Sequence, residues 1–580
     1  MNNYTTNDDL RADLISSEDN LGDALLAVKQ PLTRAEKRTQ HDKNSEIVSI
    51  RDFYNENDGE DYSPALTKAL AAGVSVFIPP GKYILRATVS IPSNSEIYGI
   101  AGSSILASPE AVSSNGAELI TVLVSDGADN IYLHDFRVDG GCNELVTIKR
   151  SSRGIRLRDS TNIRFENMEV SRTADWATSF ERCKNVWAIN YKHVQAEGPL
   201  TGGRDGFHCL DCENVVLDGA DIDSGDDCAS ATSETVGSYN ITFRNIRGSS
   251  DIGSIAIYNE ERDSTQPSGY ARMDASNLHF EDIRVKKGGT ARSVVRIAKY
   301  NPDSIITDCS VVRASGQSSA SHAAHFSGIN GLCLSGIDVS ATKNGHGVYI
   351  TSCQSVRGDV KGTTLVPNYD GVQIYNCSGV DLSAESFDAA NYGIHINGLT
   401  RSVIRPKAIN CGSKGFSSSV GGGMRIVNCS NVDVPSGIMY GDSSSSYYGL
   451  LYASGNSNIN IGSGVITQGY IDSANLPIEW RLHRPKVILS FKEGSDGLVT
   501  TNRAYGCTLT RISKGYYEVT FNSSMNSTGF AFSLQAFHVG AQRHVILASA
   551  ITQTGFTFKV LDNTDSVVYS DNVKLIAYDS

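Results

Sequence analysis

The sequence has 580 residues, a formal net charge of −12 at pH 7 and a pI near 5.5, which argues against nucleic acid as a partner. Charged residues make up 20% and hydrophobic residues 40%, which excludes a collagen-like chain and global disorder. No run approaches the ~18 apolar residues of a membrane span and no charged-then-apolar leader opens the chain, so we expect no membrane insertion. The chain is rich in glycine and poor in helix formers, as is typical of many short strands.

Residues 1–46 differ in character from the rest of the chain. They contain helix formers, an amphipathic stretch around Leu21–Val28 and a break at Pro31. We expect a short helical arm here. Such an arm either ties down one end of the protein or attaches the chain to another protein.

Residues 47–130 form a second unit. A polar turn precedes a helix predicted over Ser63–Ala72, with Ser63 as its N-cap and Pro64 in its first turn. A strand then ends in Pro79-Pro80-Gly81. We expect this unit to cap the repeats that follow it.

From 131 to 472 the chain repeats. Short strands follow Asn, Cys or Ser turn residues at 161, 183, 212 and 239 and onwards, and a second series of strands falls between them. Most starts within a series lie 22–29 residues apart, which is too short for βαβ units and too regular for a sandwich. The repeat predicts a parallel β-helix of about 14–16 stacked coils.

Alternation within the second series predicts which side chains point outward. Stacking the coils places one such position above the next, so the outward residues form a stripe along the axis. The stripe is either an ordinary solvated face or the floor of a groove for a long ligand with hydroxyl and carboxylate groups. Its predicted members are His208, Ser230, Ala256, Arg296, His325, Tyr349, Gln373, His395 and Arg425.

The C-terminal region, 486–580, contains alternating strands of about eight residues with turns between them, which predicts an antiparallel β-sandwich. Residues 473–485, with Pro477 and Pro485, are expected to be a linker. The twelve cysteines show no zinc-ligand spacing, and several recur at one place in the repeat. We therefore expect buried free thiols, with no metal and no cofactor.

Three aspartates carry the strongest chemical signal. Asp205 stands just before one strand, and Asp226 and Asp227 stand just before the equivalent strand about one coil later. Coil stacking predicts that the three carboxylates converge, and their mutual repulsion raises at least one pKa. One carboxyl can then remain a proton donor while another acts as a base, which is the division that glycoside hydrolysis needs. The outward-pointing Arg296 is a candidate ligand for a sugar carboxylate or hydroxyl.

The motifs around these residues resemble two related families. Residues 47–85 resemble the first module of the pectate-lyase-like superfamily. Gly203-Arg204-Asp205-Gly206, Gly225-Asp226-Asp227-Cys228 and Val295-Arg296-Ile297-Ala298 resemble the signatures of the polygalacturonase family of glycoside hydrolases. The resemblance implies a right-handed β-helix and an inverting hydrolase. Asp226 or its neighbour would be the general acid, and Asp205 and Asp227 would position a water.

Two departures from the polygalacturonase pattern concern the substrate. Gly253 takes the place of the family's histidine, and Ala298 takes the place of its lysine, although Lys299 follows at once. The carboxylates are kept while the galacturonate-reading groups are not. We therefore expect a polysaccharide other than pectin.

The whole chain, read in order, resembles bacteriophage tailspike depolymerases. This resemblance implies a homotrimer whose arm docks to the virion tail or another tailspike and whose β-helix cleaves host capsule or lipopolysaccharide. It also implies synthesis in a bacterial cytoplasm, action at the cell surface, and a trimerising or carbohydrate-binding C-terminal sandwich.

Two alternatives remain open. A polysaccharide lyase on the same fold would need a base, for which His208, Tyr258, Arg296 and Lys299 are candidates. Glu260 and Glu261 form a further carboxylate pair close by. A receptor-binding adhesin without catalysis is the alternative from another class.

Overall fold

The computed structural model describes most of the chain between residues 6 and 578. The residues it does not describe are 1–5, 17, 19–20, 30–32, 35, 45–46, 111–117, 144–151, 196–202, 251, 261–272, 413–420, 442–447, 469, 473–484, 494–498, 506, 514–515, 522–530, 539–540, 548–554, 562–571 and 579–580. Of the linker predicted over 473–485, only Pro485 is described. Glu261 lies outside the described residues. The described helices are all too short or too polar to span a membrane.

The N-terminal elements are short. Helix α1 (Asn7–Leu14) is closed by a capping box in which Thr6 and Asp9 exchange hydrogen bonds. The helical segment thus lies before the amphipathic stretch around Leu21–Val28, which instead contains a 3₁₀ turn (Gly22–Leu25) and strand β1 (Ala27–Lys29). Strand β1 pairs antiparallel with β2 (Lys37–Thr39), and α2 (Gln40–Asn44) follows.

Helix α3 (Ser63–Ala71) forms where it was predicted, although the cap position is Tyr62 and Ser63 is the first helical residue. It buries Ala65, Leu66, Ala69 and Leu70 against the first coils. The early strands are β3 (Val48–Ser49), β4 (Val76–Phe77), β5 (Gly81–Ile84), β7 (Ser95–Tyr98), β8 (Ser104–Ala107), β10 (Asp129–His134), β11 (Arg137–Asp139), β13 (Thr161–Glu166) and β14 (Glu169–Ser171).

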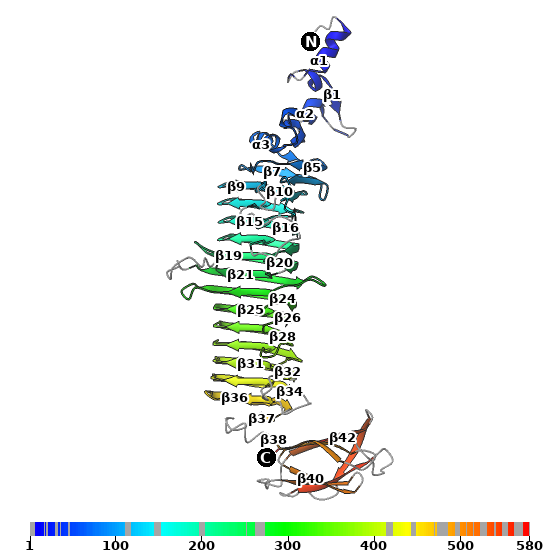
Figure 1. Ribbon diagram of the computed structural model, residues 1–580, viewed down its shortest axis with the longest axis vertical. Helices are drawn as coiled ribbons and strands as arrows, with labels where there is room; N and C mark the ends of the chain where they lie inside the picture. The colour runs from blue at the N-terminus through cyan, green and yellow to red at the C-terminus, as the bar shows by residue number, and fades with distance from the viewer. Residues whose placement is uncertain are drawn as a thin grey trace.

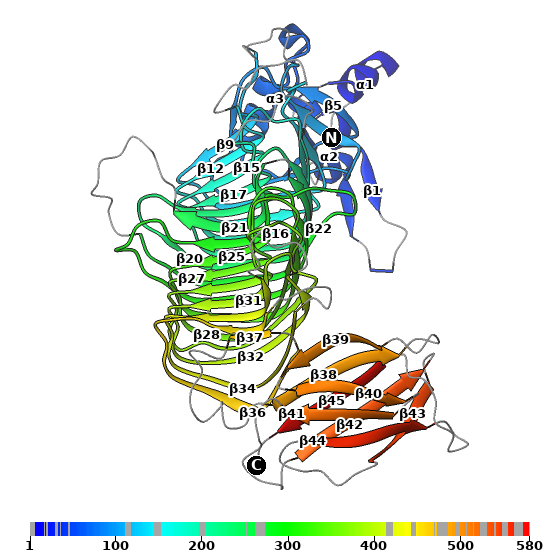
Figure 2. The same cartoon turned by 60° about the horizontal axis from the view of Figure 1, so that its bottom comes forward.

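Two long parallel sheets make the body of the molecule, as the repeat predicts (Figures 1 and 2). The first has fifteen strands and is called the short-strand sheet here. Its members are β6 (Val89–Ser90), β9 (Leu123–Asp126), β12 (Ile155–Arg158), β15 (Thr178–Glu181), β17 (Phe207–Leu210), β19 (Ala229–Ser233), β21 (Ser254–Glu260), β23 (Ser293–Ala298), β25 (Ala324–Ser327), β27 (Val348–Thr351), β29 (Val372–Tyr375), β31 (Tyr392–Asn397), β33 (Gly422–Val427), β35 (Tyr448–Tyr452) and β37 (Tyr470–Asp472).

The second sheet continues the early strands with longer ones and is called the long-strand sheet. These are β16 (Lys184–Val194), β18 (Glu213–Ser224), β20 (Ser238–Ser250), β22 (Ala275–Val285), β24 (Ile306–Ser318), β26 (Ile329–Ala341), β28 (Gln354–Thr364), β30 (Asp381–Phe387), β32 (Thr400–Cys411), β34 (Ser430–Gly441) and β36 (Ser457–Gln468). The fold is the right-handed parallel β-helix that the sequence predicts.

The interior of the solenoid is filled by side chains from both sheets. Phe180 and Phe207 pack with ring centroids 5.1 Å apart, and Phe243 stacks on Phe280 at 5.2 Å. All twelve cysteines are free, and eleven of them are buried, which confirms the predicted buried thiols; Cys333 is exposed. The Cys183 and Cys212 thiols donate to backbone carbonyls of adjacent coils, so each satisfies its own small polar group.

The C-terminal strands pair antiparallel in a sheet of eight, as predicted for this region. They are β38 (Pro485–Glu493), β39 (Val499–Tyr505), β40 (Cys507–Ser513), β41 (Tyr516–Phe521), β42 (Ala531–His538), β43 (Ala541–Leu547), β44 (Gly555–Leu561) and β45 (Asn572–Tyr578). Their packing as a two-layer sandwich stays a prediction.

A ladder of asparagines closes one corner of successive coils. All five of these asparagines have left-handed backbones, with φ between 54° and 58°: Asn162, Asn185, Asn214, Asn240 and Asn277. The side-chain amides of Asn185, Asn214 and Asn240 each donate to the asparagine amide oxygen of the preceding coil, at 3.0 Å from Asn214 to Asn185 and 2.8 Å from Asn240 to Asn214. Asn162 donates to the carboxylate of Asp129. Asparagine suits the corner because it tolerates this backbone and its amide both donates and accepts.

The ladder gives a stability prediction. Asn214→Ala removes two amide hydrogen bonds and leaves a β-carbon in a left-handed backbone, so we expect a loss of about 2 kcal/mol in the free energy of unfolding. Asn214→Gly relieves the backbone and should lose less. Denaturant unfolding of both variants measures this, and equal losses for the two would contradict the backbone part of the explanation.

Candidate active site

The three predicted aspartates converge at one edge of the short-strand sheet. Phe207 pairs with Ala229, so Asp205 and Asp227 occupy the same position in adjacent coils, with Asp226 beside them. One carboxylate oxygen from each of the three lies within 4.8 Å of the others. We call this group the carboxylate cluster.

Backbone contacts fix the cluster. The Gly203 N–H donates to Asp226 at 2.7 Å, and the Ser254 N–H donates to Asp227 at 2.5 Å. The hydroxyl of Ser224 donates to the Asp226 carbonyl at 2.5 Å, and that of Ser250 donates to the same carbonyl. The carboxylates are therefore held by groups from the coils on either side.

Gly253, at the place of the polygalacturonase histidine, lies directly against this backbone. A β-carbon there would lie 2.2 Å from the Asp226 carbonyl carbon and 2.4 Å from the Asp227 nitrogen. No side chain fits at that distance. The absence of the family's histidine is thus built into the packing of the two coils.

Electrostatics favour a retained proton in the cluster. Burial, together with the neighbouring charges of Asp205 and Asp226, raises the pKa of Asp227 well above its usual range. Burial also raises the pKa of Asp226, although the Gly203 N–H and the charges of Arg292 and His208 oppose this. The adjacent pair can therefore carry a proton at a pH where an isolated aspartate is ionised.

Asp205 is held by His208. The Nδ1 of His208 lies 2.6 Å from Asp205 Oδ2, and its Nε2 lies 2.8 Å from the Thr232 hydroxyl. Trp176 stacks on the imidazole with ring centroids 3.6 Å apart, and the Arg153 guanidinium lies 4.1 Å from the Trp176 ring centroid. His208 is 2% exposed, so it positions the Asp205 carboxylate and is itself shielded from solvent.

Three other predicted site residues differ in what their side chains contact. Arg296 lies on the same face, its charge lowers the pKa of Asp227, and its Nε has no hydrogen-bond partner among the described residues. Lys299 donates its Nζ to the carbonyls of Pro302 and Ser304 and so holds a loop. Glu260 is buried and accepts from the backbone N–H groups of Tyr300 and Asn301.

Tyr258 corrects a prediction. It is fully buried, and its hydroxyl lies 3.0 Å from that of Ser233, so it cannot contact a polysaccharide. Strand register gives the reason: Tyr258 pairs with Ala231 and Ile297, which also point into the solenoid. By the same register the outward residue of β21 is Ile257, and the predicted Ala256 points inward.

The remaining stripe residues lie in one register, which we call the outward column. Arg296 pairs with His325, His325 with Tyr349, and so on along the axis. These outward side chains are buried or half-buried although they face away from the core, so the column is recessed. Its members are His208, Ser230, Ile257, Arg296, His325, Tyr349, Gln373, His395 and Arg425.

A second column contains residues that sequence reasoning missed. The position two before the first paired residue of each strand, which Asp205 and Asp227 occupy, is taken further along by His322, His346 and Asp370. We call this the corner column. An alignment of the repeats on their strands would have placed these residues in the column of the catalytic candidates. Trp176, two residues before Thr178 of β15, occupies the same column one coil before Asp205, so the same alignment would have placed it there too.

Only oxygen donors are available for a metal at the carboxylate cluster. Among the described residues it is the one group of three ligating side chains close enough to share an ion. Carboxylates suit hard cations such as Mg²⁺ or Ca²⁺, but protonation of the Asp226–Asp227 pair competes with such an ion.

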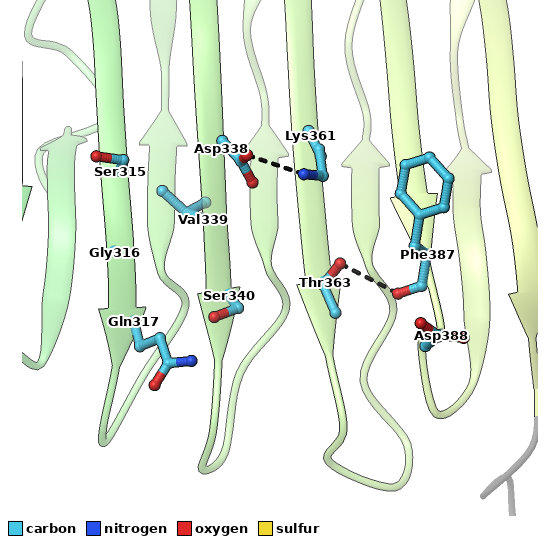
Figure 3. Close-up of a pocket in the computed structure, with 10 residues that line it drawn as sticks. All are labelled: Ser315, Gly316, Gln317, Asp338, Val339, Ser340, Lys361, Thr363, Phe387 and Asp388. Carbon is cyan, nitrogen blue, oxygen red and sulfur yellow. Dashed lines mark hydrogen bonds and ion pairs between the residues drawn. The ribbon is translucent and has the colours of Figure 1, made fainter.

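A cavity of about 430 Å³ lies elsewhere, on the long-strand sheet (Figure 3). Both carboxylates that line it are bonded, Asp338 to Lys361 at 2.8 Å and Asp388 to the side chain of Asn410 at 2.5 Å. The ring of Phe387 lies 5.8 Å from the Lys361 ammonium. Both carboxylates of this cavity are therefore engaged by neighbouring side chains of the sheet.

Comparison with known proteins gives one family match and several relatives. Residues 112–266 match glycosyl hydrolases family 28. The tail spike protein of Shigella phage Sf6 is 37% identical over 147 residues, 23% of this chain and 23% of that protein. The pre-neck appendage protein of Bacillus phage B103 is 30% identical over 127 residues, 22% and 15% of the two chains. Polygalacturonase QRT2 of Arabidopsis thaliana is 32% identical over 106 residues, 18% and 23%.

These alignments span about a quarter or less of each relative's length. Among solved structures, a tailspike of E. coli bacteriophage HK620 covers 99% of both chains with a TM-score of 0.46 and 12% identity.

The carboxylate cluster lies within the segment that matches family 28. Fold and segment together define a parallel β-helix with a polygalacturonase-like domain. The predicted resemblance to phage tailspikes is confirmed as well, by the relatives from Sf6 and B103.

The histidines of the two columns give a pH prediction. Burial lowers the pKa of His322 and of His325 from 6.5 to about 3, with smaller contributions from His346 and Arg296. Both are therefore neutral when folded at pH 5, whereas the unfolded chain binds protons there. Stability should fall as the pH decreases from about 6.5 towards 3.

Thermal unfolding across this interval measures the effect. A His322→Gln, His325→Gln variant should lose less stability on acidification than the native chain. His41→Gln, at an exposed histidine of the arm, is the control and should follow the native curve. Identical curves for the double variant and the native chain would contradict the assignment.

Proposed function

We propose that this chain is a phage tailspike depolymerase that hydrolyses glycosidic bonds of a bacterial surface polysaccharide, capsule or lipopolysaccharide, at the carboxylate cluster. One observation carries the proposal: two adjacent aspartates with raised pKa values meet a third carboxylate on a recessed face of a β-helix. The family 28 segment and the tail spike relatives support it.

The reaction uses one protonated carboxyl group and one ionised carboxylate of the cluster. The protonated member of the Asp226–Asp227 pair donates its proton to the glycosidic oxygen as the bond from that oxygen to the anomeric carbon breaks. A water attacks the anomeric carbon and transfers its proton to an ionised carboxylate of the cluster, with Asp205 oriented by His208. One carboxyl is consumed as an acid and one carboxylate is protonated, so the site returns to its starting charge.

Stereochemistry is a separate point. Family resemblance predicts inversion, but the cluster oxygens lie within 4.8 Å of one another, closer than the ~6.5–9.5 Å usual for the carboxyl pair of inverting enzymes. Proton NMR of the first-formed anomer decides between the two. We expect the inverted anomer, and a retained anomer would contradict that prediction.

The contacts disfavour the lyase alternative. Of its four candidate bases, Tyr258 is buried in the core, His208 has both ring nitrogens engaged, and Lys299 donates to two carbonyls. Only Arg296 keeps a side-chain nitrogen without a partner in the described part of the chain. An adhesin without catalysis would need neither the converging carboxylates nor their raised pKa values.

The remaining parts are proposed from the same resemblance. The arm (1–46) attaches the chain to the virion tail or to another tailspike, residues 47–130 cap the solenoid, and residues 131–472 carry catalysis. The C-terminal region (486–580) trimerises the protein or binds carbohydrate. Sedimentation of the full chain tests the homotrimer.

Asp226→Asn tests the site. We expect it to lower kcat on the cleaved polysaccharide by about 10²–10⁴-fold, because a general acid or its proton-sharing partner is lost. The far-ultraviolet spectrum and the oligomeric state should not change. Asp223→Asn, at a carboxylate paired with Lys286, is the matched control and should keep near-native activity. Near-native activity of Asp226→Asn would overturn the site.

Product analysis tests the reaction class. Incubation with a panel of purified capsular and lipopolysaccharide glycans should release oligosaccharides with new reducing ends. Hydrolysis adds one water per cut, which mass spectrometry shows directly. Ultraviolet absorbance of an unsaturated uronate in the products would establish a lyase instead, and no release from any glycan that the protein binds would favour the adhesin.

A further inference from the structure

The columns carry a second cluster of polar and aromatic groups, several coils beyond the carboxylates. His322 and His346 stack in adjacent coils with ring centroids 5.1 Å apart and planes at 8°. Tyr349 lies 4.6 Å from the His322 ring and 5.3 Å from the His325 ring. These rings form a continuous aromatic surface across β25 and β27, and His322, His325 and Tyr349 are only half-buried.

Hydrogen bonds fix how the two corner histidines face. The His346 backbone N–H donates to Nδ1 of His322 at 3.0 Å, and the Asp370 backbone N–H donates to Nδ1 of His346 at 2.8 Å. Each Nδ1 is therefore an acceptor without a proton, and each neutral ring keeps its proton on Nε2. Neutral stacked rings are suited to the apolar C–H face of a pyranose.

The next coils add hydrogen-bonding and charged groups. Asp370 accepts from His395 Nδ1 at 3.0 Å, and the Asn391 side chain and the Tyr392 N–H donate to its other oxygen. This arrangement parallels the bond between Asp205 and His208 in the carboxylate cluster. Asp370 is thus fully engaged and holds His395 in place.

Two nitrogens at the far end have no hydrogen-bond partner among the residues that the structure describes. The Nε2 of His395 and the Nε of Arg425 are buried, and neither makes a hydrogen bond among the described residues. Buried polar atoms are normally bonded, so these two indicate a missing ligand: an acceptor for the Arg425 Nε–H, and a hydroxyl donor for His395 Nε2, whose ring already donates through Nδ1. The Arg425 guanidinium lies 5.6 Å from the Tyr392 ring centroid, and no carboxylate of the described residues pairs with it.

We propose that His322, His325, His346, Tyr349, His395 and Arg425 form a distal glycan-binding platform for an acidic polysaccharide. A sugar ring stacks on the His–Tyr surface, Arg425 binds the carboxylate of an acidic sugar, and His395 Nε2 accepts from a sugar hydroxyl. The platform rests on the proposed function in one respect, that the bound chain is the one cut at Asp226 and Asp227.

Coil height sets the distance between the two sites. Strand β31, which carries His395, lies six coil steps from β19, and β33, which carries Arg425, lies seven. At about 4.8 Å per coil the separation is roughly 29–34 Å. A pyranose unit is about as long as a coil is high, so a chain must extend about seven sugar residues to occupy both sites.

The binding test uses the full chain carrying Asp226→Asn, so that cleavage does not interfere. Its affinity for immobilised capsular and O-antigen polysaccharides is measured alone and with a platform substitution added. Tyr349→Ala and Arg425→Ala should each weaken binding by about tenfold or more. Tyr349→Phe, which keeps the ring, and Lys361→Ala, on the long-strand sheet, should bind as the parent does.

A second arm identifies the bound group. Reduction of the polysaccharide carboxyl groups to hydroxymethyl groups should weaken binding to the parent as much as Arg425→Ala does. The reduced polysaccharide should then bind the parent and the Arg425→Ala variant equally, because both changes remove one contact. Additive losses would overturn the carboxylate assignment.

The active protein gives the third arm. On oligosaccharides of increasing length, kcat/KM should rise until the chain reaches about seven residues, and Tyr349→Ala should reduce that rise. The platform is overturned if binding survives Tyr349→Ala and Arg425→Ala, or if none of the polysaccharides binds to the parent. If the native chain binds and does not cleave while both variants lose binding, the platform stands and the hydrolase proposal fails.

Discussion

The stacking of coils in strict register is the constraint on which the rest of this molecule depends. Left-handed corners bonded amide to amide, from Asn162 through Asn277, keep each coil directly above the last. A slip of one residue would turn every outward side chain inward. Because register holds, residues about one coil apart in sequence become neighbours in space, which is how three aspartates from two coils meet.

Repetition made the fold readable from the sequence. Period-two strands separated by turn residues predicted the coils, and the spacing from Asp205 to Asp226 and Asp227 predicted their convergence. The buried thiols followed from the recurrence of cysteine at one corner. Each of these inferences needs only local pattern and the rule that coils stack.

What escaped prediction depends on register at single-residue precision or on contacts made across coils. The outward residue of β21 is Ile257, one place from the Ala256 that alternation suggested, and the same offset buries Tyr258. Lys299 and one carboxylate oxygen of Glu260, both candidates from the sequence, bond nearby backbone groups instead of facing a ligand. The support that Trp176 and Thr232 give to His208 comes from the coils before and after it, and those contacts depend on side-chain orientation that strand spacing alone does not give.

Gly253 has a further consequence for how specificity can change. A β-carbon on this residue would lie within 2.5 Å of the peptide between Asp226 and Asp227, so a histidine cannot be introduced by substituting Gly253 alone. The coil would first have to move away from the aspartates and would disturb the groups that hold them. A change of substrate preference that needs a side chain at position 253 therefore requires a change in the spacing of the coils first.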